Sequence, residues 1–214
     1  MSAFPVILSS PSGGGKTTIA RELLALRADV GYSVSCTTRV ARKDEREGVD
    51  YHFLSREQFR EAIERHDFAE AAEVHGELYG TLRSEIDRVL GEDRHVVMDI
   101  DVQGARQLAR AYPESVLVFV LPPSAEVLLE RLRSRRTEGP DSFARRLASA
   151  VEELRSVPLY DYVVVNDDLR LAVERVSAII DAEMVRRVRA TALDARVERL
   201  IGELQAAAEF NPVN

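Results

Sequence analysis

The sequence predicts an α/β fold in which a mostly parallel sheet is covered by helices. Four apolar runs have the length of strands: "FPVIL" (4–8), "HVVMDI" (95–100), "VLVFVL" (116–121) and "DYVVVN" (161–166). Helical patterns such as "SAEVLLERLRSRR" separate them, which is the alternation expected of parallel strands connected by helices. The chain of 214 residues is long enough for a sizeable core, as either one domain or a core that carries insertions.

The first predicted strand runs into the glycine-rich segment "SSPSGGGKTT" (9–18), and the helical pattern "IARELLAL" (19–26) follows. Glycine tolerates the dihedral angles that turn successive N–H groups inward, and a helix N-terminus adds further donors, so the turn predicts an anion site. The pattern is that of a phosphate-binding loop (P-loop), with Ser10 in the place of the first glycine. We expect Lys16 to contact phosphate and the Thr17 hydroxyl to bind Mg²⁺. A flexible turn is the alternative, but the flanking strand and helix favour the phosphate site.

The stretch from Ser33 to about Gly91 is more polar and is predicted to be an insertion off the sheet. Within it, "SREQ" (55–58) has the pattern of a capping box in front of the helix "FREAIERHD" (59–67).

A second chemical feature is "VVMDIDVQG" (96–104). Asp99 follows an apolar run and should lie at the carboxyl end of a strand, where open α/β sheets bind ligands. Asp101 points to the same side if the strand continues. Acids at such positions often only cap the next helix, but beside a P-loop we favour an acid that holds Mg²⁺.

Residues 131–146, "RLRSRRTEGPDSFARR", are rich in arginine. They contain six arginines and only two acidic residues, Glu138 and Asp141. A run of charges is usually a solvated helix face. Next to a nucleotide site, phosphate binding becomes the favoured interpretation because arginine binds phosphate oxygens in a bidentate fork.

Bulk composition excludes several classes of protein. A net charge of −7 argues against a protein that coats nucleic acid, so we expect no nucleic-acid partner. The single cysteine, Cys36, cannot form an internal disulfide, and neither a secretory signal nor an apolar stretch of membrane-spanning length is evident. We therefore expect no membrane partner and a cytoplasmic location.

The tail from Arg186 to Ala208 is predicted to be a helix with one apolar face. Its apolar residues are Leu193, Val197, Leu200, Ile201 and Leu204. Packing on the core as a clasp is one explanation and a contact between subunits of a homo-oligomer is the other. In neither case is the tail part of the active site.

Seven strings in one order resemble the guanylate kinase family of the bacterial type, almost from end to end. They are "SSPSGGGKT", "YSVSCTTRVAR", "DYHFL", "FAEAAEVHGELYGT", "VVMDIDVQG", "RLRSRRTEGPDSFARRL" and "DYVVVNDDL". The resemblance implies a three-layer P-loop kinase fold with a central parallel sheet, an insertion that binds the nucleoside monophosphate, and a helical lid. It also implies an ATP:GMP phosphotransferase of purine nucleotide metabolism that forms GDP and ADP with Mg²⁺, with dGMP as a second candidate acceptor.

The same resemblance divides the chain into four parts. The P-loop core would comprise 1–32, 92–124 and 159–187, the GMP-binding subdomain 33–91, the lid 125–158 and the C-terminal helical tail 188–214.

The resemblance also assigns site residues. ATP would be bound by Ser10, Pro11, Ser12, Gly13, Gly14, Gly15, Lys16, Thr17, Thr18, Arg135, Arg146 and Asn166. GMP would be bound by Ser35, Arg39, Arg42, Tyr51, Glu70, Tyr79, Thr81 and Asp101. Catalysis would rest on Lys16, Arg39, Arg42, Asp99, Arg135 and Arg146, and Thr17 and Asp99 would hold the metal.

Hydrogen-bond chemistry supports the assignment of Glu70 and Asp101 as residues that recognise the guanine base. Guanine presents N–H donors at N1 and at its amino group, and an ionised Glu70 or Asp101 is acceptor-only. Adenine offers an acceptor at N1, which a carboxylate leaves unpaired. A solvated surface role is the alternative for Glu70, because Glu73 and Glu77 lie nearby.

Two other functions would leave different residues in place. A scaffolding module of the same fold, with ATP binding lost, would lack an intact P-loop and lid arginines. A kinase of phosphorylated sugars would have no need of the acids at Glu70 and Asp101. The sequence retains both sets of residues.

Overall fold

The computed structural model describes residues 3–74, 76–134, 140–190 and 193–210. Its main sheet has five parallel strands in the order β2-β7-β1-β8-β9. The strands are β1 (Pro5–Ser9), β2 (Val30–Tyr32), β7 (His95–Asp99), β8 (Val116–Leu121) and β9 (Tyr162–Val165). The four strands predicted from apolar runs are confirmed. The edge strand β2 was missed because its three residues, "VGY", are too few to form a pattern.

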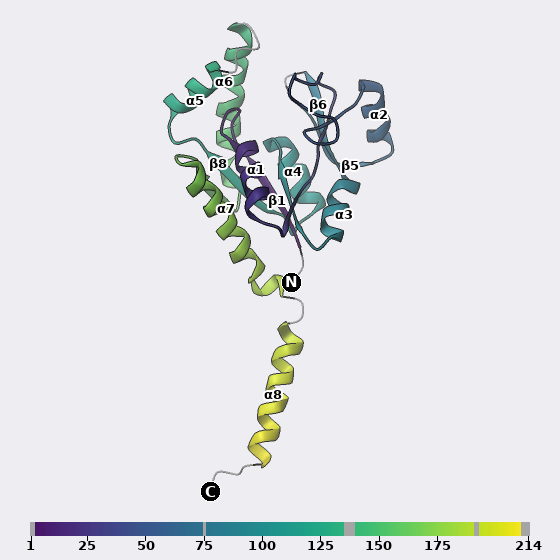
Figure 1. Cartoon of the computed structure of the whole chain (residues 1–214), viewed down its shortest axis with the longest axis vertical. Helices are drawn as coiled ribbons and strands as arrows, with labels where there is room; N and C mark the ends of the chain where they lie inside the picture. The colour runs from purple at the N-terminus through teal and green to yellow at the C-terminus, as the bar shows by residue number, and fades with distance from the viewer. Residues whose placement is uncertain (1–2, 75, 135–139, 191–192, 211–214) are drawn as a thin grey trace.

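Helices cover both faces of this sheet, which gives three layers (Figure 1). On one face lie α1 (Lys16–Leu26) and α7 (Leu169–Met184). On the other lie α3 (Arg83–Gly91) and α4 (Val102–Ala111). The P-loop connects β1 to α1 and therefore opens at the carboxyl end of the central strand.

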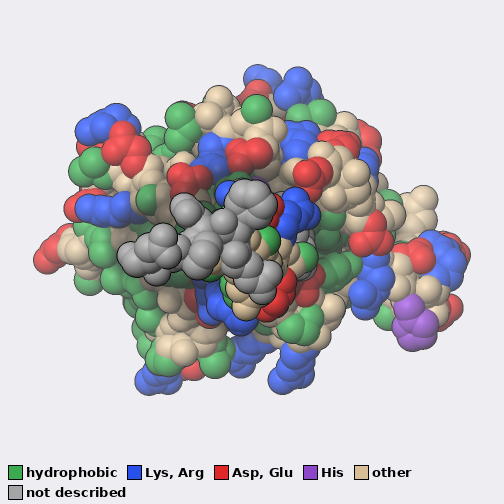
Figure 2. Space-filling model, turned by 90° about the horizontal axis from the view of Figure 1, so that it is seen from below, with side chains coloured by type: hydrophobic (Ala, Val, Ile, Leu, Met, Phe, Trp, Pro, Cys, Tyr) green, Lys and Arg blue, Asp and Glu red, His purple; other side chains and the backbone are tan. Residues whose placement is uncertain are grey.

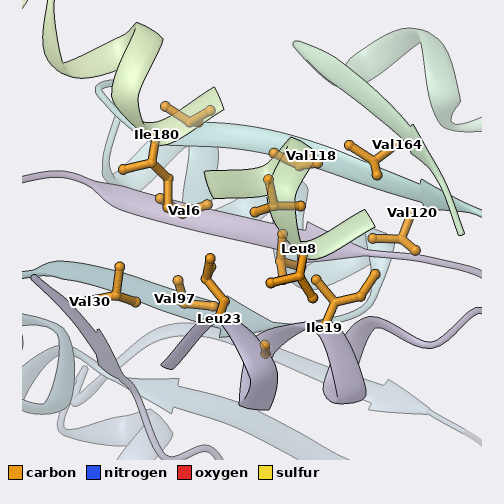
Figure 3. Close-up of a cluster of buried hydrophobic side chains, with 14 of the residues drawn as sticks. Val6, Leu8, Ile19, Leu23, Val30, Val97, Val118, Val120, Val164 and Ile180 are labelled. Atoms are coloured by element: carbon orange, nitrogen blue, oxygen red, sulfur yellow. The ribbon is translucent and has the colours of Figure 1, made fainter. Parts of the chain in front are cut away.

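Branched and aliphatic side chains form the core on the α1 and α7 face (Figure 3). Val6 and Leu8 of β1 meet Ile19 and Leu23 of α1, and Ile180 of α7 lies over the same strand, all with no exposed surface. Burying such side chains stabilises a fold by about 1.5 to 3 kcal/mol each. The strand and helix that flank the P-loop are thus anchored in the core.

A smaller sheet of four strands, in the order β4-β3-β6-β5, comes from the polar stretch. Its strands are β3 (Cys36–Thr37), β4 (His52–Phe53), β5 (Phe68–Val74) and β6 (Glu77–Leu82), and α2 (Arg56–Glu64) packs on it. The Phe59 and Phe68 rings stack with their centroids 4.4 Å apart. The predicted capping box is confirmed, because Ser55 and Gln58 exchange hydrogen bonds between side chain and backbone at the start of α2.

Helix α4 joins the two sheets. The side-chain amide of Gln107 donates to the carbonyl of Ala71 in β5 (2.9 Å) and accepts from its N–H (3.1 Å). The Gln107 side chain thereby forms the pair of hydrogen bonds that a neighbouring strand would form with Ala71 at the edge of the small sheet.

Two helices, α5 (Ala125–Ser134) and α6 (Pro140–Arg155), form an arm beside the main sheet (Figure 1). Leu128, Leu132 and Ala150 are buried between them. A short 3₁₀ turn, η1 (Val157–Leu159), leads from the arm into β9.

The C-terminal segment departs from the prediction of one helix from Arg186 to Ala208. Helix α7 ends at Met184, a 3₁₀ turn η2 (Arg187–Arg189) follows, and helix α8 spans Leu193–Phe210. Helix α8 extends away from the body (Figure 1), and every described side chain from 193 to 208 is exposed. The interpretation of the tail as a clasp packed on the core is therefore wrong for the part of the chain that the structure describes.

Seen from the α8 end, basic and acidic side chains are interspersed over the surface (Figure 2). This face carries no broad basic patch. Within the described ranges, no helix combines the length and the apolar character needed to cross a bilayer.

Candidate functional site

The P-loop has the backbone geometry that its glycines predict. Gly13 (φ +85°) and Gly15 (φ +98°) adopt left-handed conformations that residues with a side chain rarely adopt. The Gly14 N–H donates to the carbonyl of Pro11 (2.7 Å), which closes the turn. The Ser10 hydroxyl donates to the same carbonyl (3.0 Å), and a Cβ at Gly14 would lie 2.6 Å from that of Ser10. A serine in place of the first glycine is thus accommodated because position 14 has no side chain.

Two long side chains hold the loop from the opposite side. Asn166, buried at the end of β9, donates its amide to the Gly14 carbonyl (2.9 Å). Arg131 of α5 approaches the same carbonyl with Nη1 (3.5 Å). Asn166, expected near ATP, therefore contacts the loop directly. Arg131 was not singled out, since in the basic run nothing distinguishes it from its neighbours.

The expected metal ligands meet at the edge of the main sheet. Leu8 of β1 lies opposite Asp99 of β7, and the Asp99 carboxylate reaches Thr17 at the start of α1. The Thr17 hydroxyl donates to one Asp99 oxygen, and the Tyr32 hydroxyl donates to the other at 2.5 Å. A hydroxyl and a carboxylate are the oxygen donors that Mg²⁺ prefers.

Thr17 and Asp99 supply only two oxygen ligands, which is typical of a Mg²⁺ site and too few for a metal bound by protein side chains alone. The described residues contain no group of three or more His, Cys, Asp or Glu that could hold a metal. Mg²⁺ is commonly bound by one or two protein oxygens, with substrate phosphates and water completing its octahedron.

Glu153 of α6 is a site residue that the sequence did not reveal. Its Oε2 accepts a hydrogen bond from the Ser12 N–H of the P-loop (3.2 Å). Burial raises the pKa of this carboxyl to about 7, and the charge of Lys16 offsets part of that rise. An acid that titrates near neutrality therefore lies beside the lysine expected to bind phosphate. It is 141 residues from Ser12 in sequence and one of two adjacent glutamates in α6, so no local signal marked it.

On the side of the small sheet, Arg39, Tyr51 and Tyr79 form a cluster. The Arg39 guanidinium lies over the Tyr51 ring, 5.4 Å from its centroid, and the Tyr51 and Tyr79 rings are 6.1 Å apart. Burial and the nearby Asp99 charge raise the pKa of Tyr51 to about 12, so its hydroxyl remains a hydrogen-bond donor. Glu45 pairs with Arg39 at 2.9 Å and accepts from the backbone N–H of Arg42 (2.8 Å). The cluster offers a cation and two tyrosine side chains, which suit a phosphate.

Glu70, Thr81 and Asp101 form the third group. Glu70 is 4% exposed and accepts a hydrogen bond from the buried Thr81 hydroxyl (2.8 Å). Burial, reinforced by the charge of Asp101, raises the pKa of Glu70 to about 7 although Thr81 opposes the rise. The alternative of a solvated surface role for Glu70 is therefore wrong.

Asp101 lies at the N-terminus of α4 and not on a continuing strand. The strand β7 ends at Asp99, and the Asp101 carboxylate caps α4 by accepting from the Gly104 N–H (2.8 Å). A Cβ at Gly104 would lie 2.5 Å from Glu70 Oε2 and 3.3 Å from Asp101 Oδ1. The absence of a side chain at 104 thus lets the two acids approach each other.

The other residues expected in the site have positions that say little about a ligand. Arg146 lies on α6 two turns before Glu153, on the same side of the helix. Arg42 is exposed and reaches Glu45 at 3.8 Å. Ser35 uses its carbonyl to accept from the His52 N–H (2.9 Å). Arg135 lies outside the described residues.

The arrangement joins three kinds of chemistry: a P-loop beside an oxygen pair suited to Mg²⁺, an arginine and tyrosine cluster suited to a second phosphate, and an acid pair, the buried Glu70 and the half-buried Asp101, suited to N–H donors. Such a site can hold two anions and one base with exposed N–H groups.

Comparisons with known proteins agree with this arrangement. A protein-family model described as guanylate kinase matches residues 2–183. The chain is 48% identical over 184 residues to the guanylate kinase of Symbiobacterium thermophilum, which covers 86% of this chain and 87% of the relative. It is 45% identical over 185 residues to that of Myxococcus xanthus, with 86% and 88% covered. A crystal structure of guanylate kinase from Anaplasma phagocytophilum superposes with a TM-score of 0.77 at 34% identity, over 92% of this chain and 95% of that one.

Proposed function

This chain belongs to the guanylate kinase family, and on that premise we propose that it transfers the γ-phosphoryl group of ATP to GMP, forming ADP and GDP. The observation that carries the proposal is the buried pair of Glu70 and Thr81 in a chain whose P-loop is intact. The P-loop accounts for a nucleoside triphosphate, and the buried acid accounts for guanine as the acceptor base.

On the ATP side, the proposed contacts are the loop residues Ser10, Pro11, Ser12, Gly13, Gly14, Gly15, Lys16, Thr17 and Thr18, with Asn166, Arg135 and Arg146. Asn166 supports this assignment by holding the Gly14 carbonyl and so fixing the direction of the loop N–H groups. We propose that Thr17 and Asp99 hold Mg²⁺, which when bound neutralises phosphate charge and aligns the reacting groups.

On the GMP side, the proposed phosphate contacts are Ser35, Arg39, Arg42, Tyr51 and Tyr79, and the base contacts are Glu70, Thr81 and Asp101. An ionised Glu70 accepts from the guanine N1–H and amino group. The Thr81 hydroxyl, which donates to Glu70 in the free protein, orients the carboxylate.

The chemistry needs no general base. The acceptor is a phosphate with a second pKa of about 6, so it is mostly a dianion at neutral pH. The obstacle is the approach of two anions. Lys16, Arg39, Arg42, Arg135 and Arg146 would neutralise and orient them, and closure of the arm would keep water from accepting the phosphoryl group.

We further propose the division of the chain into core (1–32, 92–124, 159–187), GMP-binding subdomain (33–91), lid (125–158) and tail (188–214). The small sheet and its separate apolar cluster support the second part. The exposed apolar row on α8 supports the tail as a subunit contact in a homo-oligomer. A cytoplasmic location is proposed from the lone cysteine and the nature of the substrates.

The test is ADP release from Mg²⁺-ATP measured in parallel with GMP, dGMP, AMP, CMP, UMP and no acceptor. We expect turnover with GMP to exceed turnover with AMP by about 10⁴ in kcat/KM, the discrimination that a mismatched buried polar group can give. Equal turnover with GMP and AMP would contradict the proposal. No turnover with any acceptor, together with undetectable ATP binding, would favour a scaffolding module.

A further inference from the structure

Helix α8 has an apolar face that nothing in the described chain covers. Its 18 residues project from the body (Figure 1), and Val197, Leu200 and Leu204 are 43%, 49% and 71% exposed. Most of the stability of a helix in a protein comes from packing of its apolar face, and Gly202 in the interior weakens α8 further. A partner that covers this face would therefore stabilise the helix.

The spacing of the apolar residues indicates what kind of partner fits. Leu193, Val197, Leu200 and Leu204 follow one another at intervals of four, three and four, and Ala207 continues the series. This is the a/d repeat by which two helices pack knobs into holes. Ile201 lies on one flank of this seam.

We propose that α8 pairs with α8 of a second copy of this chain in antiparallel orientation, which deepens the subunit contact proposed above. In this arrangement Val197 packs against Leu200 of the partner subunit, and Leu193 packs against Leu204 of the partner subunit. The two-fold axis passes between residues 198 and 199, so the same two pairs recur on the other side and form four apolar layers. One helix supplies both halves of the interface, as a two-fold contact requires.

Charge complementarity selects this orientation. Arg196 and Glu203 each directly precede a core residue, Val197 and Leu204, and occupy the same flank of the helix. In an antiparallel pair that flank faces its own counterpart, so Arg196 faces Glu203 of the partner subunit and two ion pairs form. In a parallel pair, Arg196 would face Ile201 of the partner subunit and Glu203 would face Ala208 of the partner subunit, and no ion pair would form.

The position of α8 is compatible with this pairing. It lies at the opposite end of the molecule from α2, α5 and α6 (Figure 1), so two bodies joined through α8 leave the P-loop and the small sheet accessible. The pairing is thus expected to change mass and stability and to leave turnover unaffected.

Charge reversal in the full chain tests the pairing, with the dimer dissociation constant measured by sedimentation over a concentration series. Arg196→Glu alone and Glu203→Arg alone place like charges opposite each other twice, and each should raise the dissociation constant about tenfold or more. The double variant Arg196→Glu/Glu203→Arg should restore it. The matched control is Arg199→Glu, on the outer side of the helix, which should leave it unchanged.

Cysteine variants test the orientation independently. Leu193→Cys/Leu204→Cys should form a disulfide-linked dimer under mild oxidation, whereas Leu193→Cys alone should not, because position 193 meets position 204 of the other copy. Ready cross-linking of the single variant would establish a parallel pair and overturn the proposal.

The outcomes separate this inference from the proposed function. A dimer that is lost on deletion of residues 191–214 but is insensitive to the charge reversals would overturn the register alone. A wild-type chain that stays monomeric at every concentration would overturn the subunit contact as well. Phosphorylation of GMP, measured on the same samples, reports on the enzyme in either case.

Discussion

The carboxylate of Glu70 and the hydroxyl of Thr81 lie 2.8 Å apart in a part of the small sheet where neither is more than 4% exposed. One hydrogen bond from Thr81 leaves most of the acceptor capacity of the carboxylate unused. Burial in this position raises the pKa of Glu70 to about 7, which is unfavourable for the free protein at neutral pH and becomes useful once N–H donors arrive.

Glu70→Gln should lower kcat/KM for GMP about ten- to a hundredfold, because one charge-assisted hydrogen bond of about 1.5 to 3 kcal/mol is lost. Activity toward AMP should fall less or rise, since an amide can donate to the adenine acceptor. The measured quantity is the ratio of kcat/KM for GMP to that for AMP, in which a general loss of catalysis cancels. An unchanged ratio would show that the carboxylate does not face the base.

The raised pKa of Glu70 also predicts a pH dependence of GMP binding. Below pH 7 the carboxyl is largely protonated, and binding guanine must release that proton, so the dissociation constant of GMP should rise up to tenfold per pH unit as pH falls. Calorimetry between pH 5.5 and 8 measures it. Glu70→Gln is the control, because it retains the titration of the GMP phosphate but lacks this carboxyl; equal pH profiles in the two proteins would contradict the assignment.

The Glu70 carboxyl should also make the stability of the fold depend on pH. Through this group the unliganded protein should become more stable as pH falls, whereas GMP binding becomes weaker. An acid whose pKa is higher in the folded than in the unfolded protein stabilises the fold below about pH 4.5, and that contribution is lost as pH rises through about 7. Glu70→Gln without ligand should therefore melt at a higher temperature than the wild type at pH 8, with the difference shrinking at pH 5.

Gly104→Ala should impair GMP recognition without touching a ligand. The added Cβ would lie 2.5 Å from Glu70 Oε2, so the carboxylate must move, whereas the helix position itself favours alanine. We expect kcat/KM for GMP to fall about tenfold or more and KM for ATP to stay the same. Gly91→Ala in α3, where a Cβ would meet nothing within 4 Å, is the matched control. Wild-type binding of GMP by Gly104→Ala would show that this position of Glu70 is not required.

Glu153→Gln should tighten the binding of ATP. The carboxylate takes the Ser12 N–H and faces the charge of Lys16, so it opposes the incoming phosphates whenever it is ionised. Removal of that charge should lower KM for ATP about three- to tenfold at pH 8 and less at pH 6, where the wild-type carboxyl is mostly protonated. The neighbouring exposed Glu152→Gln is the control. An increase in KM for Glu153→Gln at both pH values would show instead that the carboxylate supports the closed loop.

Arg146→Ala should depress kcat, since its charge is needed most when the phosphoryl group is in transfer, and GMP affinity without ATP should change little. Loss of a transition-state arginine can cost about 10³ in rate. Steady-state kinetics and calorimetry on the same variant separate the two effects. Unaltered turnover would show that Arg146 belongs to a solvated helix face and has no role in phosphoryl transfer.

The parallel sheet and the P-loop were predictable because their signals are local. Uninterrupted apolar runs of strand length recur between helical patterns, and glycines at 13 and 15 occupy positions that need a positive φ. The proximity of Thr17 and Asp99 followed from the rule that parallel strands end at the same edge. The fold was therefore largely accessible from periodicity and turn chemistry.

What was missed depends on long-range contacts. Glu153 and Ser12 are brought together only by the packing of α6, and Arg131 differs from the other arginines of its run only through the loop that it faces. Gly104 lies inside a helix, and the sequence does not show that Glu70 packs against it and leaves no space for a side chain. For Asp101 the sequence left two positions open, a continuing strand and the cap of the next helix, and the end of β7 at Asp99 selects the cap.

Glu183 illustrates a buried charge with a structural role. It is 1% exposed and accepts from Tyr162 (2.5 Å), Arg186 (3.1 Å) and Arg189 (3.0 Å). Burial alone would raise the pKa of Glu183, but these hydrogen bonds outweigh it and lower the pKa. The network ties the end of α7 to β9 and to the turn that precedes α8.

Glu183→Gln should therefore destabilise the fold by about 3 kcal/mol, the cost of breaking a buried ion pair from one side. Because the pKa is lowered, the wild-type advantage is present above about pH 4.5 and is lost as pH falls through the folded-state pKa. Urea unfolding at pH 7 and pH 4 measures both. Glu174→Gln, which breaks an exposed pair with Arg170 on the same helix, should cost under about 1 kcal/mol; an equal loss in both variants would contradict the structural role.

The pairing of Gln107 with Ala71 has a consequence for solubility. Strand β5 is an edge strand, and an uncovered edge offers free N–H and C=O groups to any other chain in the solution. In the whole protein, α4 occupies that edge and satisfies one residue on it through a side-chain amide. A fragment spanning residues 33–91 would lack this cover, so it is expected to aggregate through β5 even if its own small core still folds.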